Sequence, residues 1–274
     1  MKRALIVSYS VVAYAAFLAV VLWAIAFLAD LHIVTAVDRG PRDPWLRAVV
    51  IDLALLGAFA LHHSVMARDS AKRLITRVVP PATERSTYVL VADALLALVL
   101  WQWRPIAGSV WHVSAQPWRD ILWAGYGLGW LTAVASTFMV DHFDLVGLRQ
   151  AASRPGDYEP PTFKVRWLYA RVRHPLMLGL LIAFWITPDM TAGHLLFALA
   201  ATGYIAIGVQ LEERDLRREL RQRYLDYASQ VPAIVPRLDR RRPDASHLLA
   251  HLLVQQHADD LHRAAERAQM ERIG

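Results

Sequence analysis

The 274 residues are 55% hydrophobic and include ten tryptophans, and several runs of membrane-spanning length carry few or no charges. This composition excludes an ordinary soluble domain and predicts an integral membrane protein. The absence of cysteine excludes disulfides, iron–sulfur clusters, zinc–thiolate sites and covalent thiol mechanisms. The net charge of +6 lies in segments beside hydrophobic runs, which favours attraction to anionic lipid over nucleic-acid binding.

Two membrane segments are predicted at the start of the chain. Residues 4–29 carry no formal charge and no convincing cleavage pattern follows, which indicates a retained transmembrane helix and not a signal peptide. The loop 30–44 lacks positive excess and is expected outside. The second segment spans residues 48–67, and the basic connection 68–85 after it is expected in the cytoplasm.

The third and fourth segments are predicted over residues 87–103 and 121–140. Tryptophans surround the loop between them and predict an aromatic belt at the outer interface: Trp101, Trp103, Trp111 and Trp118. The glycines at positions 125, 127 and 129 lie inside an apolar helix, which indicates close helix packing and not a phosphate-binding loop.

The last two segments are predicted as a helical hairpin. Residues 141–174 are rich in arginine and proline and are expected in the cytoplasm. The run 175–188 is short for a span at about 1.5 Å per residue, whereas 190–211 is long enough. Counting both keeps the arginine-rich C-terminus inside. The fold class expected is therefore all-α, a polytopic membrane helix bundle of five to six segments with cytoplasmic C-terminal helices.

Two regions are expected along the chain. Residues 1–211 form a transmembrane bundle with cytoplasmic loops, and residues 212–274 form a cytoplasmic helical tail that completes the cofactor site. A helix is expected over 212–227, and a last helix from residue 243 carries leucines on one stripe that lies against membrane or loops. Both termini are expected on the cytoplasmic side of a bacterial plasma membrane.

Polar side chains gather at the predicted cytoplasmic ends of these segments. We expect them to meet in one polar pocket, open to the cytosol and bordered by lipid. Each pair alone is explained better by interfacial anchoring or by charge pairing than by a function, and only the combination favours a site. The set comprises His62, His63, Glu84, Arg85, Tyr88, His142, Asp144, Arg173, His174, Glu212 and Glu213. Metal binding is not expected, because adjacent histidines on a helix diverge by about 100°.

Residues 171–179 (Arg-Val-Arg-His-Pro-Leu-Met-Leu-Gly), with Glu-Glu-Arg-Asp-Leu at 212–216, resemble membrane methyltransferases of the isoprenylcysteine carboxyl methyltransferase and phospholipid methyltransferase type. Further blocks resemble the methanethiol S-methyltransferase family, and they begin at His62, Glu84, Trp101, Ser136, His142 and Met190. The resemblance covers roughly residues 62–236. The wider superfamily usually has tyrosine two residues after the proline, where this chain has Met177.

This resemblance implies methylation of a small volatile thiol by S-adenosylmethionine, converting methanethiol to dimethyl sulfide, with hydrogen sulfide as a second acceptor. The cofactor-binding positions that match are Arg173, His174, Pro175, Gly179, Glu212 and Glu213. The cofactor carries a carboxylate, an ammonium and a ribose diol, so it calls for basic donors and carboxylate acceptors. We expect Arg173 and His174 at the carboxylate end, the two glutamates at the ribose or ammonium, and Gly179 to permit close approach.

A thiol attacks a sulfonium only as its thiolate, so the site needs a base or a positive field. His142 is the candidate base, with Asp144 or Glu84 to orient it and Arg85 or His63 to favour the anion. Direct contact between His142 and Asp144 requires a loop conformation, because the two are only two positions apart. The expected partners are the thiol and membrane lipid, without nucleic acid or an obligate protein.

Two other functions stay open. One is a related methyltransferase that acts on a larger lipid or prenyl substrate. The second is a non-enzymatic membrane protein that binds haem or metal through its histidines, as in six-helix proteins of nitrogen-oxide metabolism.

Overall fold

The computed structural model describes residues 2–66, 68–154, 157–159, 165 and 167–236. The chain divides into two compact units. Unit 1 comprises Met1–Phe163 and Leu176–Val209, and unit 2 comprises Lys164–Pro175 and Gln210–Gly274. The sequence does not predict that residues 164–175 belong with the C-terminal part of the chain.

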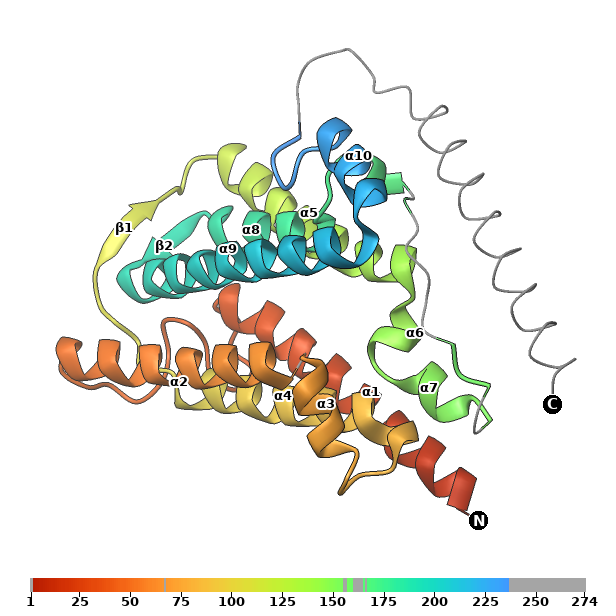
Figure 1. The fold of residues 1–274 in the computed structure, drawn as a ribbon. Helices are drawn as coiled ribbons and strands as arrows, with labels where there is room; N and C mark the ends of the chain where they lie inside the picture. Colours follow the sequence, from red (N-terminus) through yellow and green to blue (C-terminus); the bar gives the residue numbers. More distant parts are fainter. Residues whose placement is uncertain (1, 67, 155–156, 160–164, 166, 237–274) are drawn as a thin grey trace, which may run out of the picture. The chain divides into compact units, whose positions relative to one another are not determined.

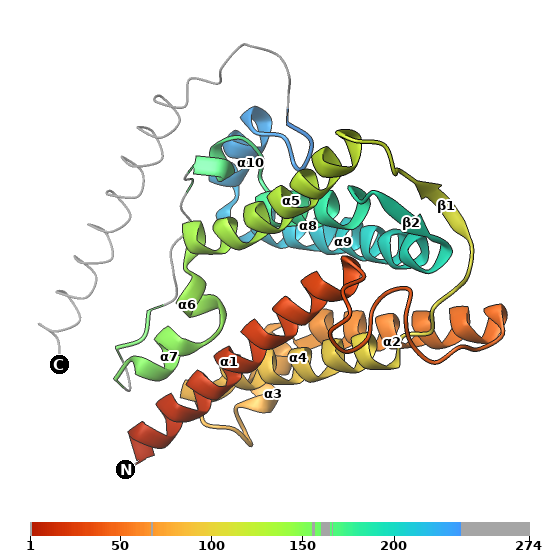
Figure 2. The same ribbon diagram turned by 180° about the vertical axis from the view of Figure 1, so that it is seen from behind.

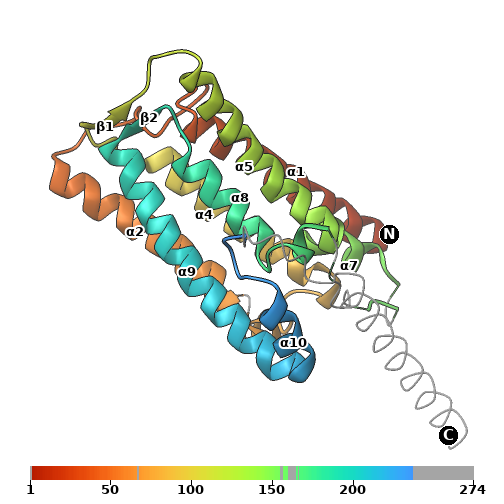
Figure 3. The same cartoon turned by 90° about the horizontal axis from the view of Figure 1, so that it is seen from above.

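Long helices make up most of unit 1 and lie in two layers (Figures 1 and 2). One layer holds α1 (Lys2–Leu28), α2 (Trp45–Met66) and α4 (Glu84–Gln102), with α4 in contact with both of the others. The second layer holds α5 (Trp118–Val140), α8 (Pro175–Trp185) and the first part of α9 (Ala192–Leu220), which run alongside one another in Figure 3. The remaining short helices are α3 (Asp69–Ile75), η1 (Pro81–Thr83), α6 (His142–Leu145), α7 (Leu148–Ala152), η2 (Trp167–Ala170) and α10 (Gln222–Gln230).

The all-α membrane fold is confirmed, but the number of segments differs from the expected five to six. Among the described residues, four helices are long and apolar enough to cross a membrane: α1, α2, α5 and α9. Helix α4 carries Glu84, Arg85 and Asp93, which lower its mean hydropathy. Helix α8 has 11 residues, which rise about 16 Å, roughly half the thickness of a bilayer's hydrocarbon core.

Helix α9 continues past residue 211, where the apolar run ends. Two ion pairs along its polar part support the helix, Arg217 with Glu213 at 3.0 Å and Arg218 with Asp215 at 3.6 Å. The helix stops at Arg221, whose φ of 47° is left-handed. The single helix expected over 212–227 is therefore wrong, because α9 ends at Leu220 and α10 follows. The helix expected from residue 243 lies outside the described residues.

Close packing by small residues joins α5 to α8 within unit 1. A Cβ atom added to Gly129 would lie 2.6 Å from the backbone nitrogen of Ala183 and 2.8 Å from the carbonyl oxygen of Gly179. One added to Gly179 would lie 2.5 Å from the nitrogen of Ala133. The packing role predicted for Gly129 is confirmed, whereas Gly127 has no atom within 4 Å of its added Cβ.

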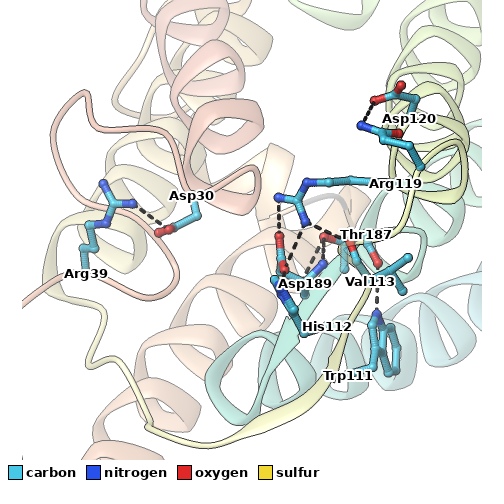
Figure 4. Close-up of polar contacts among 10 residues, drawn as sticks. Asp30, Arg39, Trp111, His112, Val113, Arg119, Asp120, Thr187 and Asp189 are labelled. Atoms are coloured by element: carbon cyan, nitrogen blue, oxygen red, sulfur yellow. Dashed lines mark hydrogen bonds and ion pairs between the residues drawn. The ribbon is translucent and has the colours of Figure 1, made fainter.

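Two short strands tie loops together at one end of unit 1. Strands β1 (Ser109–His112) and β2 (Asp189–Thr191) pair antiparallel. Arg119 donates to the Asp189 carboxylate at 2.8 Å, and the His112 ring bonds to the same carboxylate (Figure 4). The Trp111 indole donates to the carbonyl oxygen of Thr187 at 3.0 Å. The sequence did not predict these strands, because three or four residues carry too little periodicity.

Trp103 lies in the core and not in an aromatic belt, so that part of the expectation is wrong. Its side chain is 0% exposed and packs against Phe27 and Phe197, each with ring centroids 5.9 Å away. The indole N–H donates to the carbonyl oxygen of Val37 at 3.1 Å, which satisfies its polar atom inside the protein. Trp101 remains exposed.

Candidate active site

Arg173 and Glu213 form the centre of a charged cluster in unit 2. The Nε and Nη2 atoms of Arg173 donate to one carboxylate oxygen of Glu213 at 2.8 and 2.5 Å. Its Nη1 donates to the carbonyl oxygens of Ala228 and Val231 at 3.0 and 2.5 Å. Both charged side chains are only 10% exposed. The guanidinium is thus occupied by the protein itself, and it holds the segment after α10 against Glu213.

His174 lies between the two glutamates. Its Nε2 is 3.2 Å from the Glu213 carboxylate and its Nδ1 is 3.5 Å from that of Glu212. Burial lowers the pKa of His174, but the two carboxylates stabilise the imidazolium more strongly, so the pKa lies above its usual value. A protonated His174 therefore balances part of the negative charge of Glu212 and Glu213.

Backbone hydrogen bonds also hold this cluster together. The N–H groups of Arg173 and His174 donate to the carbonyl oxygens of Pro232 and Ala233 at 2.9 and 3.0 Å. Glu212, by contrast, has a side chain that is 53% exposed. Of the charged groups predicted to bind cofactor, Glu212 is the one that remains available to a ligand.

The two other predicted cofactor residues, Pro175 and Gly179, each have a structural role in a helix. Pro175 is the first residue of α8, where its fixed φ and missing N–H suit a helix start. Gly179 belongs to unit 1 and faces the backbone of Gly129 and Ala133. Its contact with cofactor stays a prediction.

Arg85 and Asp144 are brought together in unit 1. Asp144 is 1% exposed, and its carboxylate pairs with the Arg85 guanidinium, which also donates to the Asp144 carbonyl oxygen at 3.1 Å. The Tyr158 hydroxyl donates to the same carboxylate at 2.8 Å, and burial raises the pKa of Tyr158 to about 12. This triad fastens α6 to the start of α4 and leaves Asp144 fully occupied.

His142 does not hydrogen-bond to Asp144. Its Nε2 lies 2.9 Å from the Tyr14 hydroxyl and its Nδ1 lies 2.8 Å from the Thr137 hydroxyl. Phe138 stacks on the ring with centroids 4.1 Å apart. Burial lowers the pKa of His142, against the opposing charge of Asp141. Both ring nitrogens of the predicted base are therefore engaged by hydroxyl groups.

His63 and Glu84 lie in helices α2 and α4 of unit 1. His63 bonds through Nδ1 to the Tyr88 hydroxyl at 2.9 Å, and its ring also contacts that of Tyr204. Glu84 begins α4 and is 6% exposed. The polar groups expected from the sequence to meet in one pocket include Tyr88 but omit Tyr204. A hydroxyl inside an apolar helix was the available signal, since buried tyrosines usually find a polar partner.

A surface cleft of about 520 Å³ lies at the end of unit 1 that carries β1 and β2. Its lining includes Asp38, Asp43, Trp45, Ile106 and Thr191. It contains none of the residues predicted for the site. Among the described residues, no group of three or more histidine, aspartate or glutamate side chains is placed to hold a metal ion.

The sequence of this chain is similar to those of several known proteins. The chain is 49% identical over 238 residues to methanethiol S-methyltransferase of Mycobacterium tuberculosis, covering 86% of this chain and 98% of the relative. It is 48% identical over 243 residues to methanethiol S-methyltransferase 2 of Bradyrhizobium diazoefficiens, covering 88% and 93%. It is 28% identical over 190 residues to nurim of Danio rerio, covering 65% and 69%. No model of a protein family matches, and no solved structure does.

Proposed function

The chain belongs to the methanethiol S-methyltransferase family, and from this membership we propose that it methylates methanethiol to dimethyl sulfide. The observation that carries the proposal is identity of 49% running through 98% of a methanethiol S-methyltransferase. Hydrogen sulfide is the second acceptor that we propose, because it offers the same nucleophilic sulfur.

A methyltransferase needs a methyl donor, and we propose S-adenosylmethionine. When bound, this donor supplies an electrophilic methyl group on a sulfonium. The unit 2 cluster suits its polar groups, because Glu212 offers an exposed carboxylate to ribose hydroxyls or to an ammonium. Arg217 offers a guanidinium that is 53% exposed and that pairs with the same glutamate, Glu213, as His174 does.

The contacts of the cluster support a division of roles among the predicted cofactor residues. We propose that Glu212 contacts the donor directly. Arg173, His174 and Glu213 position it, because the hydrogen bonds of Arg173 and the ion pairs of His174 are already made within the protein. Pro175 contributes by starting α8 immediately after His174.

We propose that the protein lies in the bacterial plasma membrane with both termini on the cytoplasmic side. The basic segments 68–85 and 141–174 support this orientation through the positive-inside preference. A small thiol dissolves in lipid, which gives a reason for its methylation by a membrane enzyme.

Headspace gas chromatography over purified protein in nanodiscs tests the proposal. With S-adenosylmethionine and methanethiol, dimethyl sulfide should form in proportion to enzyme, and hydrogen sulfide should give methanethiol in parallel. Glu212→Ala should weaken donor binding in calorimetry. Wild-type protein that binds the donor but releases no dimethyl sulfide would refute the thiol acceptor and favour a lipid or prenyl acceptor.

A further inference from the structure

His63 sits among aromatic rings near the end of α2, all within unit 1. Phe59 stacks on its ring with centroids 5.5 Å apart and planes inclined by 27°. Tyr88 of α4 lies at 5.4 Å, and Tyr204 of α9 lies at 6.4 Å with its ring edge-on. These three aromatic side chains and His63 are called the aromatic cluster below. Three different helices therefore hold one imidazole in place.

The Tyr88 hydroxyl makes two contacts with the same histidine. It lies 2.9 Å from Nδ1 and 3.3 Å from the carbonyl oxygen of His63. A hydroxyl has one proton, so both contacts are good hydrogen bonds when Nδ1–H donates to the tyrosine oxygen and the tyrosine O–H donates to the carbonyl. In this arrangement the proton of the neutral ring is on Nδ1. The hydrogen bond made by one ring nitrogen thus sets the state of the other.

The consequence is a free lone pair on Nε2. Among the residues that the structure describes, none makes a hydrogen bond to this atom. The other histidine considered for proton transfer, His142, has both ring nitrogens bonded to hydroxyls. His142 must break a hydrogen bond before it can accept a proton, whereas His63 need not.

We propose that His63 is the catalytic base of the thiol methylation, and that Tyr88 is the positioning residue that directs its Nε2 lone pair to the thiol. This inference rests on the proposed function. The S–H bond breaks and its proton moves to Nε2, so that an imidazolium and a thiolate form together. The sulfur keeps the electron pair and uses it to bond the methyl carbon, while the pair of the donor's carbon–sulfur bond stays with the donor.

The rest of the aromatic cluster suits a small sulfur nucleophile. Sulfur packs favourably against aromatic rings, with contacts worth about 0.3–1.5 kcal/mol each. Phe59 and Tyr204 offer such surfaces beside the imidazole. A carboxylate in contact with the thiolate would oppose its formation, and none is bonded to His63 among the described residues.

The groups that can influence proton transfer at His63 come from each helix packed around it. His62 is the neighbouring titratable group on α2 and acts on His63 electrostatically. Tyr88 faces it from α4 and Tyr204 faces it from α9. Glu84, at the start of α4, acts on Tyr88. The pH dependence of the reaction is therefore expected to follow His63 with contributions from these four.

Chemical labelling tests the proposed base without turnover. Diethyl pyrocarbonate acylates an imidazole nitrogen that has a free lone pair, so peptide mapping should find His63 modified and His142 resistant. Ethanethiol, added without methyl donor, should slow labelling of His63 more than labelling of the exposed His32 in the same sample, because reagent consumed by the thiol slows both equally. Labelling of His63 that is absent, or that ethanethiol slows no more than it slows labelling of His32, would overturn the inference.

Kinetics provide the second test. His63→Gln should lower kcat/KM for methanethiol by about 10²- to 10⁴-fold at neutral pH, the range for general-base catalysis. The difference in kcat/KM between His63→Gln and wild type should decrease as the pH approaches the pKa of the thiol itself, because the thiolate then forms without a base. A structural defect would not be rescued in this way. Tyr88→Phe keeps the ring and should give a smaller loss, and His32→Gln, in the exposed loop after α1, should match wild type.

Different results would refute the proposed function and the proposed role of His63. Dimethyl sulfide production with unchanged kcat/KM in His63→Gln would refute the base and leave the proposed function intact. Wild-type protein that makes no dimethyl sulfide, but whose His63 is still protected by ethanethiol, would refute the proposed function and support the thiol site.

Discussion

Substitution by alanine should destabilise unit 2 strongly at Glu213 and very little at Glu212, although both residues lie next to each other on α9. Glu213 and its partner Arg173 are each 10% exposed, so Glu213→Ala leaves a buried guanidinium without its counter-charge. Removing one partner of a buried pair costs about 3–5 kcal/mol. The Glu212 side chain is 53% exposed and lies 3.5 Å from His174, so its pairing contributes about 0–1 kcal/mol. Glu212→Ala is therefore a control matched in residue type, helix and substitution.

Hydrogen–deuterium exchange measures this difference at two backbone amides. The N–H groups of Arg173 and His174 donate to Pro232 and Ala233, so they report whether the cluster is closed. Glu213→Ala should speed their exchange about 10²- to 10⁴-fold, while Glu212→Ala should leave it near wild type. Calorimetry should find weaker S-adenosylmethionine binding in both. Unchanged exchange in Glu213→Ala, or equal acceleration in the two variants, would refute the reasoning.

Three further predictions follow from the packing and the charges. Gly129→Ala should lower the melting temperature in detergent through an overlap that costs about 1–3 kcal/mol, whereas Gly127→Ala, with open space around its Cβ, should not. The difference in melting temperature between wild type and His174→Gln should be largest below about pH 6.5, because the carboxylates stabilise the charged form of His174. This difference should decrease as the pH rises through the elevated pKa of His174. A difference that stays constant with pH would contradict the prediction. Arg85→Ala should leave buried Asp144 without its counter-charge at a cost of about 3–5 kcal/mol, seen as faster limited proteolysis around α6. Wild-type resistance to proteolysis in this variant would argue against the triad.

The membrane fold was predictable because charge-free runs leave few alternatives. Helices α1 and α5 lie close to the expected residues 4–29 and 121–140 for this reason. The end of α9 was not predictable from hydropathy, since ion pairs and not apolar side chains support its last turns. The burial of Trp103 depends on Phe197, a residue far away along the sequence, so a local pattern places it at the interface instead.

The candidate site was predictable in residue type more than in role. Basic and acidic groups at 173–174 and 212–213 do meet in unit 2. The sequence contains no sign that backbone carbonyls occupy the Arg173 guanidinium, because every residue has a carbonyl. The Tyr14 hydroxyl that bonds His142 lies 128 positions away, and nothing in the local spacing of either residue indicates the contact.

The hydrogen bonds of Arg173 also set a time order for biosynthesis. Its Nη1 donates to carbonyl oxygens 55 and 58 residues further along the chain. At about 5–20 residues per second, the ribosome needs roughly 3–12 seconds to add them after Arg173. Until then the guanidinium has Glu213 at most as a partner, and the amides of residues 173 and 174 have no acceptors at 232 and 233. Unit 2 can therefore close only after translation has passed residue 233, and a chain interrupted before that point should not acquire a formed cluster.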